Sequence, residues 1–430
     1  MKTLKKMSPG RLIVLGFATV ITLGAITLLL PFSIREGGAV PVIDAFFTST
    51  SAVCVTGLAS IDPGNNLTNI GQAVLAMLIQ IGGLGVTSVG VGLILLARRK
   101  VTFKDRILIK ESMGLESMKG VVRFVKAILL TTLCFESVGA LLSFIVFSKT
   151  YPPIRALGIS VFHAVSAFNN AGFDVLGGFK NLADYKDNVL LNLTTCGLII
   201  FGGLGFLVIQ EIIQKRSFKK FSLHAKTVIL MTITLLASGT VLLWLTEDVT
   251  WLGAFFFSTS ARTAGFSTYA VGGFTSAGLL VLVVLMFIGA SPGSTGGGIK
   301  TTTAYTIIKN AISVATNKHC TTMKRKIPSD VVHRALTLMS LALTLVIVST
   351  FLLCIFEPQF SFMQCLFEVV SAFGTVGLST GITSNLTTAS KVVIILTMFC
   401  GRCGPLTMVS IWSFKPLPDV SYSEESIPIG

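Results

Sequence analysis

Residues 287–303 read FIGASPGSTGGGIKTTT, and two kinds of chemistry use residues of these types at this spacing. Ser291 lies in a G-x-S-x-G pattern, which is typical of a hydrolase nucleophile held on a sharp turn. Residues 293–301 approach the pattern of a phosphate-binding loop. That loop needs glycine, lysine and a hydroxyl residue in direct succession, and Ile299 interrupts them. The phosphate-loop interpretation is therefore disfavoured.

The nucleophile interpretation lacks its context as well. A nucleophile elbow needs a strand-to-helix turn and a histidine partner. Three of the four histidines lie in or beside basic loops (the four are His163, His224, His319 and His333). No charged residue occurs from 263 to 299, which indicates a membrane segment. We predict that the chain is not an enzyme.

The composition is that of a membrane protein. The chain has 430 residues, of which 52% are hydrophobic and only 12% are charged, and its mean hydropathy is +0.81. Soluble domains carry about 25% charged residues, and a membrane-spanning helix needs roughly 20 apolar residues. The clearest candidates for such spans are 12–34, 70–97, 227–246 and 335–356.

The net charge of +15 has a simpler explanation than nucleic-acid binding. Of the 34 lysines and arginines, 25 fall in the segments 2–11, 98–126, 215–226 and 300–334. Basic loops remain on the cytoplasmic side of a membrane, so both termini are expected to be cytoplasmic. The basic face could dock an acidic partner or anionic membrane lipid. No nucleic-acid partner is expected.

A fourfold internal repeat organises the chain. Four segments align on one glycine each, with a small polar residue six positions before it: SAVCVTGL (51–58), SAFNNAGF (166–173), TSARTAGF (259–266) and SAFGTVGL (371–378). A second glycine-rich marker follows each of them: GGLG at 82–85, GGLG at 202–205, GASPG at 289–293 and GRCGP at 401–405. The predicted repeats are 10–110, 111–220, 221–325 and 326–414, and 415–430 is a short cytoplasmic tail.

Each repeat reads as a long helix, a short helix, a glycine turn and a second long helix. The short segment at 42–54 cannot span a membrane and should re-enter on the side from which it came. Irregular backbone at membrane depth survives only where it is buried in protein or lines an aqueous cavity. The predicted fold is an all-α polytopic membrane protein with four pseudo-symmetric helix–pore helix–helix repeats around one central pore.

Four glycine turns around one axis could bind a dehydrated cation. Backbone carbonyls replace the water shell of such an ion, and glycine permits the positive φ that points carbonyls at an axis. Thr375 and Val376 are expected to pack behind the fourth turn. The predicted filter, with K⁺ at its carbonyls, consists of Val55, Thr56, Gly57, Asn170, Ala171, Gly172, Thr263, Ala264, Gly265, Thr375, Val376 and Gly377.

The four turns, RTAGF (262–266), SAFGTVGL and GRCGPLT (401–407) resemble the Trk/Ktr/HKT superfamily of potassium and sodium transporters over nearly all of residues 10–414. With eight long helices, the chain looks most like the pore-forming membrane subunit of Ktr-type systems. In that family, glycine in all four turns goes with potassium selectivity, and serine in the first turn with sodium. The resemblance therefore implies potassium.

The resemblance also assigns the opening segment to a gate. In this family a flexible loop below the filter interrupts the second helix of the third repeat. Five glycines and one proline in ten residues oppose a continuous helix, at about 1 and 3 kcal/mol each. The predicted gate consists of Gly289, Ala290, Ser291, Pro292, Gly293, Ser294, Thr295, Gly296, Gly297 and Gly298, together with Arg402.

The family further implies a homodimer in a bacterial plasma membrane, with a cytosolic ring of nucleotide-binding regulatory subunits. No cofactor is expected in this chain itself, because its cytoplasmic loops are short; nucleotide would act only through the partner. The transported ion is K⁺, and a dependence on Na⁺ stays open. Two alternatives remain: a sodium-permeable or poorly selective transporter of the same fold, and an ion-coupled secondary transporter, which would show two related halves.

Charges inside the membrane are candidates for function. Arg402 could place a fixed positive charge beneath the filter and hold the loop, or it could cap the carbonyls of a broken helix. Arg262 should point behind the filter, with Glu368 as its partner in filter support. Glu136 has no evident partner, and we expect an interhelical hydrogen bond. For His163, packing is the default explanation.

Overall fold

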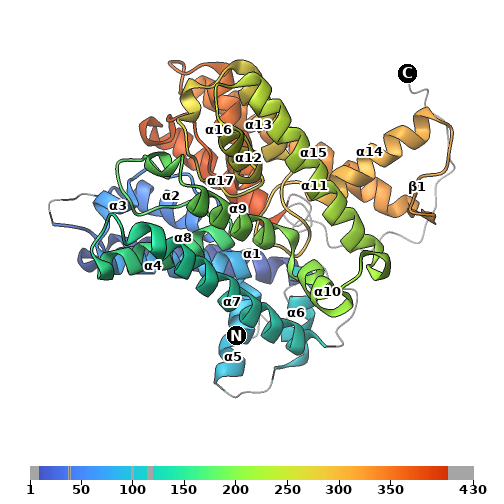
Figure 1. The fold of residues 1–430 in the computed structure, drawn as a ribbon, viewed down its shortest axis with the longest axis horizontal. Coiled ribbons are helices and arrows are strands. Elements are labelled where there is room, and N and C mark those ends of the chain that lie inside the picture. Colours follow the sequence, from blue (N-terminus) through green and yellow to red (C-terminus); the bar gives the residue numbers. More distant parts are fainter. Residues whose placement is uncertain (1–8, 37, 39, 98–100, 114–119, 405–430) are drawn as a thin grey trace.

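The computed structural model describes residues 9–36, 38, 40–97, 101–113 and 120–404. These residues are helical except for the connections and one small hairpin, formed by β1 (Thr321–Thr322) and β2 (Arg325–Lys326). The predicted tail 415–430 lies outside the described residues. Figure 1 shows the helices gathered around a central region, from which α14 and the hairpin project on one side.

The repeat appears as four long helices, each followed by a shorter helix that leads into a glycine turn. The long helices are α1 (Pro9–Leu29), α7 (Val121–Phe147), α11 (Leu223–Thr246) and α15 (Ser329–Phe356). The pore helices, as we call the shorter ones, are α2 (Val42–Val53), α8 (Pro153–Phe168), α12 (Trp251–Ser260) and α16 (Phe362–Gly374). Each pore helix packs against the long helix that precedes it.

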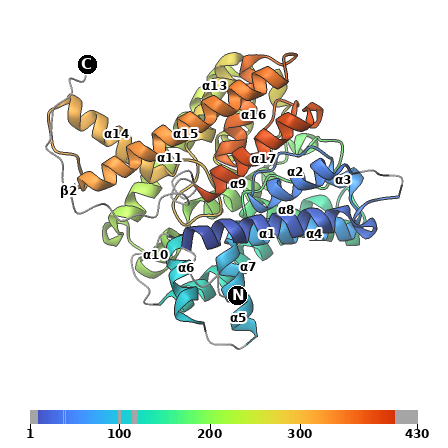
Figure 2. The ribbon, with the colours of Figure 1, turned by 180° about the vertical axis from the view of Figure 1, so that it is seen from behind.

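A second set of helices follows the turns: α4 (Asn69–Leu84) with α5 (Val86–Leu96), α9 (Val189–Leu204) with α10 (Phe206–Lys215), α13 (Ser276–Phe287) with α14 (Thr301–Ala315), and α17 (Thr388–Cys403). The short helices α3 (Pro63–Asn66) and α6 (Phe103–Met113) connect them, as do the 3₁₀ turns Pro31–Ser33, Ala183–Tyr185, Phe218–Lys220, Val271–Gly273 and Thr383–Asn385. Figure 2, from behind, shows α1 lying along α4.

The second helices are broken, which corrects one expectation from the sequence. Residues 70–97 do not form one continuous span: α4 and α5 meet at Gly85 with a bend of 100°, and α9 and α10 meet at Gly205 with a bend of 97°. Both glycines have positive φ (82° and 90°), as does Gly404 after α17 (86°). Glycine adopts a positive φ without steric cost, so the helix can end and the chain can change direction at these positions. The glycine-rich markers are therefore break points.

The described residues contain four helices long and apolar enough to cross a membrane (α1, α7, α11 and α15), or up to six spans if each bent pair is one span. The sequence had indicated eight long helices; the second helices of the first three repeats are instead interrupted, and in the fourth repeat α17 ends at Cys403. Outward faces of the long helices are apolar, as on α7, where Leu130, Leu133 and Leu141 are each more than 60% exposed. The chain is thus built as a multi-pass membrane protein.

Polar caps fix where the second helices begin. Thr68, Asn188, Thr275 and Thr387 precede α4, α9, α13 and α17, and each side chain accepts a backbone N–H of the first turn. In the third and fourth repeats, a glutamate at the end of the long helix accepts the N–H of that cap: Glu247 from Thr275 at 3.1 Å and Glu357 from Thr387 at 2.6 Å. These clamps tie the C-terminal ends of α11 and α15 to the second helices of their repeats.

Candidate functional site: four glycine turns and the loop beneath them

The four turns share one backbone conformation. The residue two before the glycine is left-handed in every repeat: Val55 (φ 57°), Asn170 (58°), Thr263 (76°) and Thr375 (51°). The glycines are also at positive φ: Gly57 (93°), Gly172 (69°), Gly265 (78°) and Gly377 (96°). A non-glycine residue in this region costs about 1–2 kcal/mol, so its recurrence in all four turns indicates that packing enforces it.

The turns close on one another as a ring. A Cβ built on Gly57 would collide with the carbonyl oxygen of Ala171, and one on Gly172 with that of Ala264. The same holds for Gly265 against Val376, and for Gly377 against Thr56. Each glycine thus faces the carbonyl of the next repeat, in the cyclic order one, two, three, four, one. Only residues without a side chain permit this approach.

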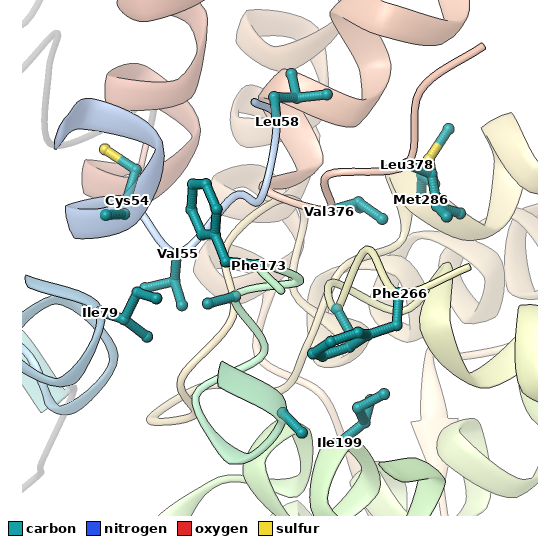
Figure 3. Packing of buried hydrophobic residues seen from close by; sticks show 14 of the residues in the cluster. Cys54, Val55, Leu58, Ile79, Phe173, Ile199, Phe266, Met286, Val376 and Leu378 are labelled. Atoms are coloured by element: carbon teal, nitrogen blue, oxygen red, sulfur yellow. The ribbon is translucent and has the colours of Figure 1, made fainter. Parts of the chain in front are cut away.

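Figure 3 shows the convergence: Val55, Phe173, Phe266 and Val376, one from each repeat, lie around the same region. All are fully or almost fully buried. Val376 packs in the core as expected. The hydroxyl of Thr375 instead accepts the N–H of Gly297 in the predicted gate loop, at 2.9 Å.

A serine anchors each turn. Ser51 and Ser371 accept the N–H of Gly57 and Gly377, both at 3.0 Å. Ser166 donates to the carbonyl of Phe173, the residue after the glycine, at 2.8 Å. These three lie six residues before their glycines.

The third repeat departs from the sequence alignment. Its anchor is Ser260, five residues before Gly265, which donates to Phe266 O at 2.5 Å. Thr259, the aligned residue, donates to Phe255 within its own helix. The reason is a shorter turn: Gly265 N reaches Ser260 O, whereas in the other repeats the residue before the glycine makes that bond.

The predicted gate loop lies directly against the turns. The helix α13 ends at Phe287 and α14 begins at Thr301, and a parallel bridge joins Ile288 to Ile299 across the base of the loop. A Cβ on Gly296 would meet the hydroxyl of Thr263. With the bond from Gly297 to Thr375, the tip of the loop contacts the third and fourth turns.

The loop is also fastened to the break of the second repeat. Ser291 N and Thr295 N donate to the carbonyls of Gly203 (3.1 Å) and Gly202 (3.3 Å). Phe206 N, at the start of α10, donates to Gly293 O at 3.0 Å. These three bonds are all between backbone groups. The Ser291 hydroxyl accepts a hydrogen bond from the Thr301 hydroxyl at 3.1 Å. The His163 side chain forms its hydrogen bond with Thr195 and not with Ser291.

Arg402 contacts both the loop and the end of a broken helix. Its guanidinium donates to Thr295 O in the loop, and to Gly82 O and Gly83 O (3.3 Å) at the end of α4. It therefore caps carbonyls of a broken helix and holds the loop. Lys300 donates to Gly296 O at 2.6 Å. The side chains of Arg402 and Lys300 line a cavity of about 250 Å³, and none of its described lining residues is acidic.

The expected pair of Arg262 and Glu368 is wrong. Arg262 donates to Gly289 O at 3.3 Å, and Glu368 accepts from Thr383 in the connection after the fourth turn. Arg262 follows the end of its pore helix, whereas Glu368 lies six residues before the end of α16. Arg262 lies three residues before its turn glycine and Glu368 nine residues before its own, so at 1.5 Å per residue the two residues differ by roughly 9 Å along the axis. Both side chains remain buried.

The other membrane charges have partners too. Glu136 accepts a hydrogen bond from Asn169 at 3.0 Å, the interhelical bond expected for it. His163 packs edge-on against Phe147 and Phe266. A buried ion pair that sequence reasoning missed joins Lys391 of α17 to Asp44 of α2 at 2.6 Å.

That ion pair links the last repeat to the first. Its two residues are 347 positions apart. The sequence signal was present: two opposite charges in apolar segments of units that must be neighbours in a ring. Because one partner alone would be a buried unpaired charge, the pair could have been inferred from the repeat.

On the side opposite the loop, a vestibule of about 360 Å³ opens onto all four glycines. Asp174, two residues after Gly172, lines it with Asp62 and Asn181. Burial, together with the neighbouring charge of Asp62, raises the pKa of Asp174 to about 6, although hydrogen bonds from Leu176, Gly177 and Asn181 act to lower it. The sequence analysis did not single out this acid.

Four related helical units around converging turns define a polytopic membrane transporter. A family model described as "TrkH: Cation transport protein" matches residues 6–423. The chain belongs to this family, whose members are transporters and not enzymes.

Curated relatives span nearly the whole chain. It is 38% identical to the potassium/sodium uptake protein NtpJ of Enterococcus hirae, over 99% of this chain and 98% of that protein. It is 36% identical to the Ktr system potassium uptake protein B of Bacillus subtilis, over 99% and 97%. The crystal structure of the potassium transporter TrkH from Vibrio parahaemolyticus has the same fold (TM-score 0.76, 20% identity, 95% of this chain and 86% of that one).

Replacing Arg402 should open the path and loosen the structure together. Arg402→Gln removes a charge whose repulsion of a cation is about 1 kcal/mol at 4 Å in water and more at lower dielectric, so cation flux should rise roughly fivefold or more. Arg402→Lys should raise it less. Flux into liposomes and melting temperature, measured on the same proteins, check this. Arg325→Gln on the exposed β2 strand is the charge-matched control. A lowered melting temperature with unchanged flux would leave only the capping role.

Protonation of Asp174 should weaken cation entry. Because its pKa is raised to about 6, the carboxylate is charged at neutral pH and neutral below that pKa. Uptake from low cation concentrations should fall as the pH on the vestibule side drops from about 7 to 5, and Asp174→Asn should remove most of that dependence. Asp184→Asn, in the same connection but exposed, should retain it. A wild-type pH profile in Asp174→Asn would contradict the assignment.

Proposed function

We propose that this protein takes up potassium across the plasma membrane through one axial pore in each chain. The ion passes the carbonyls of the four turns, residues 55–57, 170–172, 263–265 and 375–377. The observation that carries the proposal is the closed ring, in which each filter glycine faces the carbonyl of the next turn. Carbonyl oxygens without net charge suit a dehydrated monovalent cation.

Two arguments favour potassium. All four turn positions are glycine, the pattern that accompanies potassium selectivity in the resembling family. The relatives from Bacillus subtilis and Vibrio alginolyticus are named potassium uptake proteins. The second candidate, a pore that also admits sodium, is supported by the name of the Enterococcus hirae relative, a potassium/sodium uptake protein.

Gating is assigned to the loop 289–298 with Arg402. The support is its position: it contacts the third and fourth turns, and three backbone bonds join it to the second repeat. Such bonds can be exchanged for water when the loop moves aside, because small residues leave its backbone accessible. A fixed charge at Arg402 adds an electrostatic barrier along the same path.

The orientation in the membrane and the partner subunits are inferred from the charge distribution and from the named relatives. The basic segments and both termini face the cytoplasm, so the vestibule faces outward. A separate nucleotide-binding ring docks on the cytoplasmic face of a homodimer; relatives named as parts of a Ktr system support a separate subunit. An ion-coupled alternating-access transporter is disfavoured because the structure repeats four times and not twice.

The first test is selectivity. Serine at Gly57, Gly172, Gly265 or Gly377 would push its Cβ into the next turn's carbonyl and so distort two turns at once. Each variant should reduce the preference for potassium over sodium at least about tenfold, which corresponds to about 1.4 kcal/mol. Potassium and sodium fluxes into liposomes, with and without an applied voltage, measure the ratio. Wild-type ratios in all four variants would refute the filter assignment.

The second test is removal of the gate. Deleting residues 294–297 takes away the contacts with Thr263 and Thr375, and potassium flux should increase severalfold while selectivity is largely kept. Ser291→Ala is the control, because a gate should tolerate the loss of one hydroxyl whereas a hydrolase would lose its nucleophile. Lost flux in a folded deletion variant would indicate instead that the loop binds the ion.

A further inference from the structure

We propose that Glu136 is a positioning residue that sets the filter turn of the second repeat, and thereby ion selectivity, through Asn169. The inference rests on the proposed function, because it assigns a role within that filter. Glu136 lies near the middle of the long helix α7 and is half-buried. It does not line the vestibule or the cavity beneath the loop.

Asn169 is the residue at which the pore helix α8 ends and the turn begins. Its side-chain amide donates to Glu136 Oε1 at 3.0 Å and to Gln80 Oε1 of α4 at 2.8 Å, and also contacts Val165 O at 2.9 Å. The three acceptors come from different helices. They fix the orientation of the first residue of the turn relative to the first and second repeats.

Asn170, the next residue, carries that orientation into the filter. It has the left-handed φ of 58°, and its amide donates to the hydroxyl of Thr263 at 3.0 Å. Thr263 occupies the corresponding place in the third turn and contacts Gly296 of the loop. Consecutive asparagines therefore connect Glu136 on one side to two filter turns and the gate loop on the other.

The second turn is the one that needs such support. The residues that correspond to Asn169 are Cys54, Arg262 and Gly374. Arg262 bonds a loop carbonyl, and Gly374 packs its Cα against Gly298. An amide at membrane depth has no water with which to replace a lost acceptor. Removing the carboxyl of Glu136 should therefore let Asn169 rotate toward other acceptors and shift the turn.

The same geometry limits what else Glu136 could do. Among the described residues, no ion pair includes Glu136, and the donors that reach it are side-chain amides, so its role depends on accepting a hydrogen bond. Glutamine supplies the same acceptor without the charge. The conservative variant should therefore retain the function, which a role in charge or proton transfer would not allow.

Glu136→Met removes the acceptor, keeps the volume and suits a membrane helix. It should raise the sodium-to-potassium permeability ratio about five- to tenfold, while Glu136→Gln stays within about twofold of wild type. Ser137→Ala, at the exposed neighbouring position, is the control. Gln80→Leu should shift the ratio in the same direction by less, which keeps the proposal testable if Glu136→Met does not fold.

A double-mutant cycle tests the route through Asn169. In an Asn169→Ala background, Glu136→Met should add no further change in the permeability ratio. A wild-type ratio in folded Glu136→Met would reduce Glu136 to a packing role, and an equal loss in Glu136→Gln would assign the effect to charge. Additive shifts would exclude Asn169 as the intermediary. Failure of the proposed function itself would look different, because wild type would then show no potassium preference.

Discussion

Backbone carbonyls that lack hydrogen-bond partners inside a membrane are the constraint on which this structure depends. Four turns leave helical geometry at membrane depth, where each unsatisfied group costs several kcal/mol. They are tolerated because they are buried in protein around the axis, where a glycine of each turn lies against the carbonyl of the next. The ring therefore requires all four repeats, and none of them could form its turn alone. Bound cations would supply the remaining partners of these oxygens.

The broken second helices extend the same constraint to the other side of the ring. Gly85 and Gly205 end helices beneath the turns and expose the carbonyls of residues 82, 83, 202 and 203 at the helix ends, although Gly82 O still accepts the N–H of Gly85. Arg402 satisfies those of the first break, and backbone N–H groups of the gate loop satisfy those of the second. The loop is thus held by groups that would otherwise be exposed, which explains how a segment so poor in side chains keeps a defined position.

The repeat and the glycine turns could be predicted from the sequence because glycine at a fixed spacing reflects a backbone requirement. The place of the loop followed from its glycine and proline content together with the family resemblance. Predictions from the sequence were wrong where the outcome depends on how the helices and turns are placed in three dimensions. Nothing local distinguishes Ser260 from Thr259 as the anchor of the third turn, since one residue of turn length makes the difference. The pairing of Arg262 with Glu368 matched charges but ignored their levels along the pore helices. The span at 70–97 was apolar throughout, so only the positive φ of Gly85 revealed its break.

The central claim is that an ion binds on the axis of the ring, and anomalous diffraction from crystals grown with thallium, a heavy substitute for potassium, tests it most directly. We expect peaks on the axis, surrounded by carbonyls of residues 55–57, 170–172, 263–265 and 375–377, that vanish on soaking in excess potassium and persist in excess sodium. Ordered turns without axial peaks, with thallium bound elsewhere in the protein, would contradict the account.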